Sequence, residues 1–213
     1  MLLLPFWHSL FTASQKYGGF RFLLVVRDGR DIAFSSNQSP VLKFYNNSYG
    51  PGYWQATAPR SEQERAMELW NDWNVQTLDW AEQFSDDPRF EFHVFHAEDL
   101  VRGSSRDRLK AVMDLHAFVG SDTPIVSICC KLGLEDQLIR RGTTGRNYGK
   151  WKGNSNTKLI EAIHSLGFDG LEALGYDPEP NWHANLPPIA EPPCPFDIDL
   201  GYIFDRRRTF CSA

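Results

Sequence analysis

Two short segments of the chain have the hydrophobic pattern of β-strands. Residues 20–26 form an almost continuous apolar run, which is typical of a buried strand. Residues 90–95 alternate between the two faces of an extended chain and are rich in β-formers, which predicts a second strand. Segments with helical patterns precede and follow both strands. This alternation predicts an α/β fold with a parallel sheet flanked by helices.

The longest helical pattern covers residues 61–84. Ser61 and Glu64 have the spacing of a capping box, which predicts the start of this helix. An apolar stripe with helical spacing follows, and we expect it to face the core: Met67, Trp70, Thr77, Leu78, Ala81 and Phe84. Further helices are expected at residues 2–16, after Asp28, at 105–118, at 131–141, at 156–166 and from Asp169 to Gly175.

Proline and glycine mark the segments that lack a regular pattern. Residues 37–60 contain three prolines among aromatic and amide side chains, which predicts a loop. Residues 178–213 are rich in proline and show little periodicity, so we expect an extended or poorly ordered tail. The chain is therefore expected to contain one domain, residues 1–177, followed by this tail.

Composition limits the classes of function. The 213 residues, 42% of them hydrophobic, suffice for one domain with a full core. A net charge of −5 argues against nucleic-acid binding over a broad basic surface. Four cysteines are too few for a disulfide scaffold, and the sequence does not decide whether Cys194 and Cys211 form a bridge. It also leaves the oligomeric state and the cellular compartment open. The apolar residues 1–11 lack a basic leader and are too short to span a bilayer, so neither a signal peptide nor a membrane segment is expected.

A first candidate for an anion site lies at the end of the first strand. Arg27 follows residues 20–26 directly, and Ser35 lies eight residues further on, in the predicted helix. A guanidinium group can place two donors on a phosphate, and a helix start adds backbone N–H groups. A strand-to-helix turn with solvated charges is the alternative reading of these residues alone.

A second candidate lies late in the chain. The thirteen residues 140–152 contain five cations and three glycines, and glycines let a backbone approach a phosphate closely. The segment is not a Walker A loop, because residues 145–150 are one residue short and Trp151 stands where Ser or Thr must hold magnesium. The sequence therefore argues against an NTP hydrolase and leaves a basic phosphate-binding loop or a solvated surface loop.

Both clusters resemble segments of the sulfotransferases that use 3′-phosphoadenosine 5′-phosphosulfate (PAPS). In that family an arginine and a serine eight residues apart grip the 3′-phosphate, and a late basic loop with a glycine, a tryptophan and often a lysine at its end closes the site. The resemblance implies that the nucleotide-binding residues are Arg27, Ser35, Arg141 or in its place Arg146, Gly149, Lys150 and Trp151.

The resemblance extends to two further segments and implies a fold and a reaction. Residues 95–100 resemble the family's strand that ends in an acidic pair and leucine, and residues 174–176 resemble the end of its last helix. The implied fold is a P-loop-like sulfotransferase fold. The implied reaction transfers a sulfuryl group from PAPS to a hydroxyl or amine of a carbohydrate, peptide or small molecule, without a metal.

One part of the family pattern is missing from the sequence. The family binds the 5′-phosphosulfate on a loop rich in Ser, Thr and Gly that precedes the arginine strand, and the 19 residues before Phe20 contain no such loop. We therefore expect an N-terminally incomplete fold with doubtful transferase activity. A non-catalytic remnant that binds a nucleotide or a partner is the alternative.

The sequence assigns no catalytic base and no metal ligands. His8 is the only histidine before the arginine strand, and its apolar neighbours indicate a helix packed on the core rather than a base. His93 and His96 lie three residues apart on a predicted strand, so their side chains point to opposite faces and do not converge on a metal.

Overall fold

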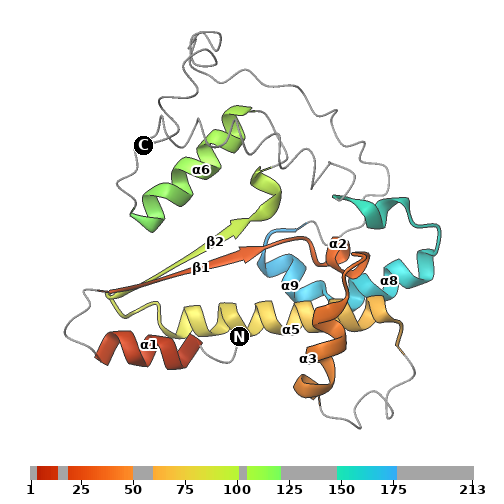
Figure 1. Cartoon of the computed structure of the whole chain (residues 1–213), viewed down its shortest axis with the longest axis horizontal. Coiled ribbons are helices and arrows are strands. Elements are labelled where there is room, and N and C mark those ends of the chain that lie inside the picture. The colour runs from red at the N-terminus through yellow and green to blue at the C-terminus, as the bar shows by residue number, and fades with distance from the viewer. Residues whose placement is uncertain (1–3, 14–18, 50–59, 101–104, 121–147, 177–213) are drawn as a thin grey trace, which may run out of the picture. The chain divides into compact units, whose positions relative to one another are not determined.

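The computed structural model describes residues 4–13, 19–49, 60–100, 105–120 and 148–176. The chain divides into two compact units, one formed by residues 1–94 and 147–184 and the other by residues 95–146 and 185–213. Each unit is described by itself. The described part is a mixed α/β structure with a small parallel sheet and helices (Figure 1), which confirms the predicted class.

The sheet consists of two neighbouring strands, β1 (Phe20–Val26) and β2 (Phe90–His96). Side chains 70 positions apart in sequence pair across the strands. The rings of Phe22 and Phe92 stack with centroids 5.7 Å apart, and Arg21 forms an ion pair with Glu91 at 2.9 Å. These pairs fix the register, because a shift by one residue would turn every side chain to the other face. Both predicted strands are confirmed.

Helix α5 (Glu62–Gln83) is the longest described helix. The hydroxyl of Ser61 accepts a hydrogen bond from the Glu64 N–H at 3.2 Å, and the Glu64 carboxylate accepts one from the Ser61 N–H at 2.6 Å. The predicted capping box is therefore confirmed. So is most of the apolar stripe, since four of its members are buried: Met67, Trp70, Thr77 and Ala81.

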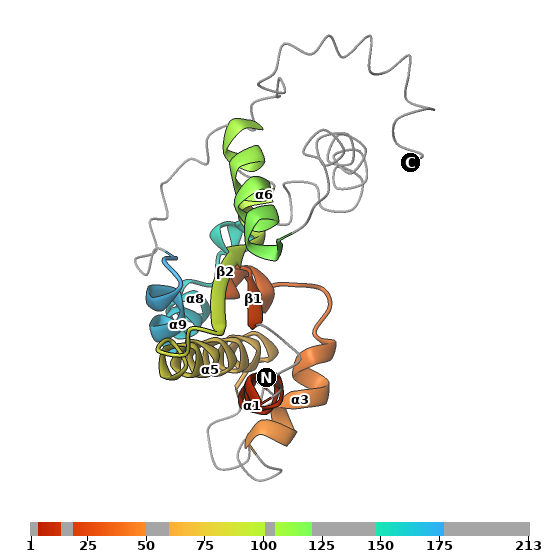
Figure 2. The ribbon, with the colours of Figure 1, turned by 90° about the vertical axis from the view of Figure 1, so that its left-hand side faces the viewer.

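Helix α5 also organises the other helices of the first unit (Figures 1 and 2), because five of them contact it. They are α1 (Leu4–Ala13), α2 (Gly29–Ala33), α3 (Ser39–Tyr49), α8 (Thr157–Leu166) and α9 (Phe168–Ala173). Side chains from α2, α3, α5, α8, α9 and β1 form one buried cluster around Met67, which has no exposed surface. The short helix α2 is thereby held between α5 and the end of β1. Leu4 of α1 belongs to a second buried cluster, with Ala81 and Phe90.

Within the predicted loop at residues 37–60, helix α3 corrects the prediction for residues 39–49, and residues 50–59 lie outside the described residues. Val41 and Tyr45 lie one helical turn apart and are both buried, and the Tyr45 hydroxyl donates to the Glu68 carboxylate of α5. Pro40 lies in the first turn, where a missing N–H costs little. Packing against α5 therefore outweighs the low helix propensity of this segment.

The remaining predicted elements agree with the structure more closely. Asn156 caps α8 through its side chain, as expected, whereas α9 begins at Phe168 with Gly167 at its cap, so Asp169 lies in the first turn instead. The second unit contains η1 (Ala97–Leu100) and α6 (Ser105–Val119), and α6 ends at Gly120 as predicted. The expected helix at 131–141 and tail at 178–213 lie outside the described residues. No helix within the described residues is both long and apolar enough to cross a membrane.

Candidate anion-binding site

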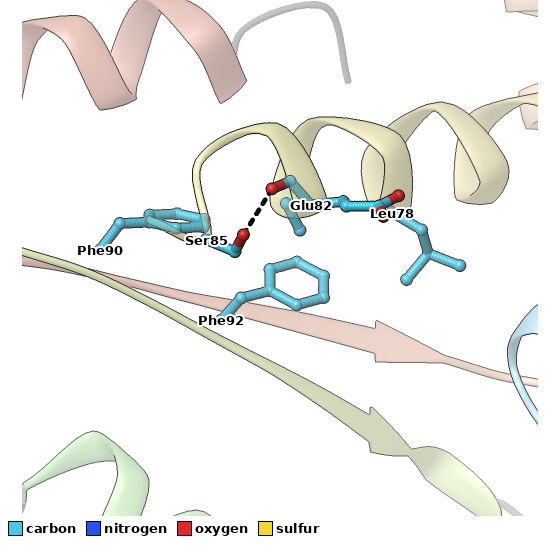
Figure 3. Close-up of a pocket in the computed structure, with 6 residues that line it drawn as sticks. Leu78, Glu82, Ser85, Phe90 and Phe92 are labelled. Atoms are coloured by element: carbon cyan, nitrogen blue, oxygen red, sulfur yellow. Dashed lines mark hydrogen bonds between the residues drawn. The ribbon is translucent and has the colours of Figure 1, made fainter. Parts of the chain in front are cut away.

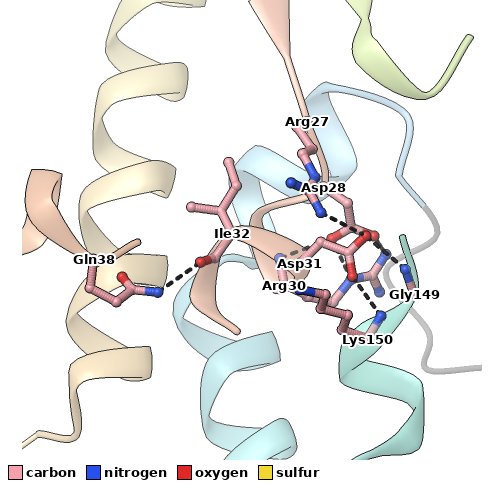
Figure 4. A network of polar contacts seen from close by, with 8 residues as sticks. All are labelled: Arg27, Asp28, Arg30, Asp31, Ile32, Gln38, Gly149 and Lys150. Carbon is pink, nitrogen blue, oxygen red and sulfur yellow. Dashed lines mark hydrogen bonds and ion pairs between the residues drawn. The ribbon is translucent and has the colours of Figure 1, made fainter. Parts of the chain in front are cut away.

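The turn between β1 and α2 is built around a buried ion pair. The Asp28 side chain accepts the Arg30 N–H at 2.9 Å and thereby caps α2. The guanidinium of Arg30 places two donors on the same carboxylate, each at 2.9 Å (Figure 4). Arg30 is only 4% exposed, so its charge is balanced inside the protein by Asp28. This pair fixes the path of the chain where β1 ends.

Asp31 joins this turn to the late basic loop. Its carboxylate accepts the N–H of Gly149 at 2.7 Å and the N–H of Lys150 at 2.9 Å (Figure 4). The side chain is fully buried. These bonds join residues 118 positions apart in sequence, so the two predicted anion-binding segments lie together.

Two aromatic side chains of the late loop face the two arginines of the turn. The guanidinium of Arg27 lies 4.7 Å from the ring centre of Tyr148, and that of Arg30 lies 4.2 Å from the ring centre of Trp151. Both distances are typical of cation–π contacts. Trp151 is 2% exposed and lies in η3 (Lys150–Gly153), a single helical turn. The loop and the turn are therefore held together by aromatic contacts as well as by Asp31.

Arg27 differs from Arg30 in its exposure. Its side chain retains 27% of its surface, and its ion pair with Asp31 is 3.7 Å long, which is beyond hydrogen-bonding distance. Lys150, next to it in the loop, is exposed. These two side chains can thus reach a ligand from solvent, and both carry positive charge at the carboxyl end of β1.

Burial raises the pKa of Asp31 above its ordinary value. The N–H groups of Gly149 and Lys150 and the charge of Arg27 lower this pKa, the neighbouring Asp28 raises it further, and burial is the largest influence. Asp31 therefore holds the loop through a carboxylate whose charge is costly in this environment.

Ser35 lies beyond the end of α2. Its hydroxyl accepts the Asn37 N–H at 3.3 Å, and its carbonyl accepts the side-chain amide of Gln38 at 2.8 Å. Gln38 also donates to the Ile32 carbonyl at 3.0 Å and so closes the end of α2 (Figure 4). The described hydrogen bonds of Ser35 are thus local and do not reach the late loop.

The predicted site residues therefore have different outcomes. Arg27, Gly149, Lys150 and Trp151 are brought together, whereas Arg141 and Arg146 lie outside the described residues. The sequence analysis assigned no role to three groups that build the site: the carboxylates of Asp28 and Asp31, and the ring of Tyr148. The spacing of the two carboxylates around Arg30 is a local signal for the role of Asp28. The role of Asp31 has no such signal, because its partners are backbone groups of a distant segment.

A pocket of about 410 Å³ lies elsewhere in the first unit, between the end of α5 and the start of β2 (Figure 3). Its lining consists of Leu78, Ala81, Glu82, Ser85, Phe90 and Phe92. These side chains supply one carboxylate and no cation. Since β1 and β2 run parallel, the pocket lies at the opposite end of the sheet from Arg27 and does not belong to the anion site.

His8, the only upstream histidine, is held in aromatic packing. Its ring stacks on Phe84 with centroids 3.8 Å apart, and its Nε2 lies 3.2 Å from the Asp87 carboxylate. These contacts agree with the predicted helix packed on the core. Within the part of the chain that the structure describes, no three His, Cys, Asp or Glu side chains are grouped so that they could hold a metal.

Comparisons with family models, curated proteins and solved structures gave no match to this chain. What the chain binds must therefore be inferred from its own residues and their geometry.

Proposed function

We propose that this chain binds the 3′-phosphate of an adenosine 3′,5′-bisphosphate group and belongs to the PAPS-dependent sulfotransferases. One observation carries the proposal. The two segments that resemble the phosphate-binding segments of that family, the turn at Arg27 and the loop at Gly149, contact each other although 118 residues separate Asp31 from Gly149.

The chemistry of the described side chains supports a phosphate ligand. Arg27 offers a partly exposed guanidinium with donors in a fork that matches phosphate oxygens, and Lys150 adds a second exposed cation. Arg30 is occupied by Asp28 and keeps the turn rigid instead. The site is therefore small and suits a single phosphate group rather than a long polyanion.

The arrangement of the elements is compatible with a P-loop-like sulfotransferase fold. Such a fold contains parallel strands with helical crossovers and binds its ligand at the carboxyl ends of the strands. Here α5 lies between β1 and β2 in sequence, and Arg27 follows the carboxyl end of β1. The resemblance and this position both favour a ligand site at the carboxyl end of β1.

The proposed reaction moves a sulfuryl group from PAPS to an acceptor. The bond between sulfur and the oxygen of the 5′-phosphate breaks, and its electron pair stays on the phosphate. A new bond forms between sulfur and the acceptor oxygen or nitrogen, whose proton passes to a base. In this scheme Arg27 and the loop at Lys150 hold the 3′-phosphate and take no part in the proton transfer.

Calorimetric titration with adenosine 3′,5′-bisphosphate, with AMP as the reference ligand, tests the proposal. We expect Arg27→Ala to weaken binding of the bisphosphate about 10- to 100-fold, since a hydrogen bond to a charged group contributes about 1.5–3 kcal/mol. Binding of AMP should change much less, because it lacks the 3′-phosphate.

Arg21→Ala is the matched control. Arg21 lies in β1, the strand that Arg27 follows, and its side chain is about half exposed in an ion pair with Glu91, so its loss should leave both affinities unchanged. Equal losses for both nucleotides in Arg27→Ala, or a folded wild type that binds neither, would contradict the proposal. Binding without sulfuryl transfer to any acceptor would support the non-catalytic alternative.

A further inference from the structure

We propose that Asp31 is the positioning residue of this anion site: it holds the loop at Gly149 and Lys150 against the turn and thereby determines selectivity for the 3′-phosphate. This inference rests on the proposed function above. Asp31 would not touch the ligand. It would act through the loop and through Arg27, both of which it contacts.

The backbone of the late loop forms a small anion-binding concavity that Asp31 fills. Gly149 has φ 74° and ψ 20°, in the left-handed region, and Lys150 begins a right-handed helical turn. Successive residues of opposite handedness direct their N–H groups to one side and form a nest for an anion. The two oxygens of Asp31 occupy this nest, one on each N–H group.

Since the nest is filled from inside the protein, a ligand must be bound by side chains. The Arg27 side chain is partly exposed and Lys150 is exposed beside the filled nest, and Tyr148 lies against the Arg27 guanidinium. Asp31 also lies 3.7 Å from Arg27. One buried carboxylate thus orients both the loop and the arginine that the ligand would contact.

The two hydrogen bonds from the loop N–H groups of Gly149 and Lys150 to Asp31, called the clamp below, are strong and specific because of the environment of the carboxylate. The carboxylate is fully buried, so water does not compete for its hydrogen bonds. Asparagine has the same size but only one acceptor oxygen, and its NH₂ group would face one of the two N–H donors. Asp31→Asn therefore removes one hydrogen bond and the charge without leaving a cavity.

Amide hydrogen exchange measured residue by residue by NMR, together with calorimetry, tests the clamp. In the wild type we expect the amides of Gly149 and Lys150 to be protected both with and without adenosine 3′,5′-bisphosphate. In Asp31→Asn at least one of them should exchange about 10-fold faster or more. The variant should also bind the bisphosphate about 10-fold more weakly, with little change for AMP.

Glu91→Gln is the matched control, because it neutralises a carboxylate on the exposed side of β2. It should leave the exchange rates of both amides and both affinities unchanged. If Asp31 had a structural role only, Asp31→Asn would lower the thermal midpoint of unfolding and leave the ratio of the affinities for the bisphosphate and for AMP unchanged. That result would overturn the inference.

The wild type alone can also overturn the inference, even if Asp31→Asn fails to fold. Unprotected amides at Gly149 and Lys150 in the free protein would mean that no clamp exists. Loss of their protection on addition of the bisphosphate would mean that the phosphate displaces Asp31 from the nest. Protected amides in a wild type that binds no bisphosphate would leave the clamp standing, while the proposed function and the selectivity that depends on it would fail.

Discussion

Gly149 has a backbone conformation that residues with a Cβ rarely adopt. Its φ of 74° directs its N–H and that of Lys150 toward Asp31. We expect Gly149→Ala to lower the free energy of unfolding by about 1–2 kcal/mol, the cost of the left-handed conformation for an L-residue. Urea denaturation followed by circular dichroism measures this change.

Gly153→Ala provides the control for that substitution. Gly153 lies in the same short segment, at the end of η3, and a Cβ there would meet no atom within 4 Å. Its replacement should leave stability unchanged or raise it slightly. If both variants lost the same stability, the loss at Gly149 would not come from its conformation.

For single residues, the sequence predicts which side chains belong to the site better than it predicts the groups that they contact. Arg27 was found because an arginine directly after an apolar strand is a local pattern. The role of Asp31 was missed because its partners are two backbone N–H groups 118 and 119 residues away, and backbone groups leave no trace in a sequence pattern. Tyr148 was missed for a similar reason, since its contact with Arg27 depends on the fold.

Among the elements, α2 depends on a very close approach to α5. A Cβ on Gly29 would lie 2.5 Å from the ring of Trp70 and 2.8 Å from the sulfur of Met67. We expect Gly29→Ala to lower the free energy of unfolding by about 1–3 kcal/mol, which is typical of overpacking. Because α2 carries Asp31, affinity for the bisphosphate should fall as well, and calorimetry measures this.

Ser36→Ala is a suitable control for that experiment. Ser36 is exposed and lies just after α2, so its replacement should change neither stability nor affinity. If Gly29→Ala kept both the stability and the affinity of the wild type, α2 would not need to lie so close to α5 in order to place the site.

The elements that were predicted correctly have strong local signals. Helix α5 has a capping box and a long apolar stripe, and the two strands are rich in β-formers. Helix α3 has the stripe Val41, Tyr45 and Tyr49, but its proline, serines and asparagines favour turns. Its stability comes from tertiary contacts, such as the hydrogen bonds of Tyr45 and Tyr49 to carboxylates of α5, and propensity cannot reveal these.

For the whole molecule, Asp31 should make stability depend on pH. Its pKa is raised by burial and by Asp28, against the opposing influence of Arg27 and of two loop N–H groups. The folded protein therefore binds this proton more tightly than the unfolded chain does. The contribution to stability is fully present below the unfolded pKa, about 4, and is lost as the pH rises through the raised pKa.

Comparison with Asp31→Asn isolates this contribution, because asparagine does not titrate. We expect the wild type to lose stability relative to the variant as the pH rises from about 4, and the difference to become constant once Asp31 is ionised. Urea denaturation of both proteins from acid to neutral pH measures the difference. If the stability difference instead grew in favour of the wild type as the pH rises, the loop N–H groups and Arg27 would lower the pKa of Asp31 by more than burial raises it.

The paired strands β1 and β2 are far apart along the chain, since Arg21 and its partner Glu91 are separated by 70 residues. Bringing such distant segments together costs chain entropy before any pairing offsets it, whereas α5 forms from neighbours along the chain. Helix α5 can therefore form early and shorten the path between the strands. During synthesis on the ribosome, β1 and β2 emerge long before Lys150, so the anion site is among the last parts of this unit to assemble.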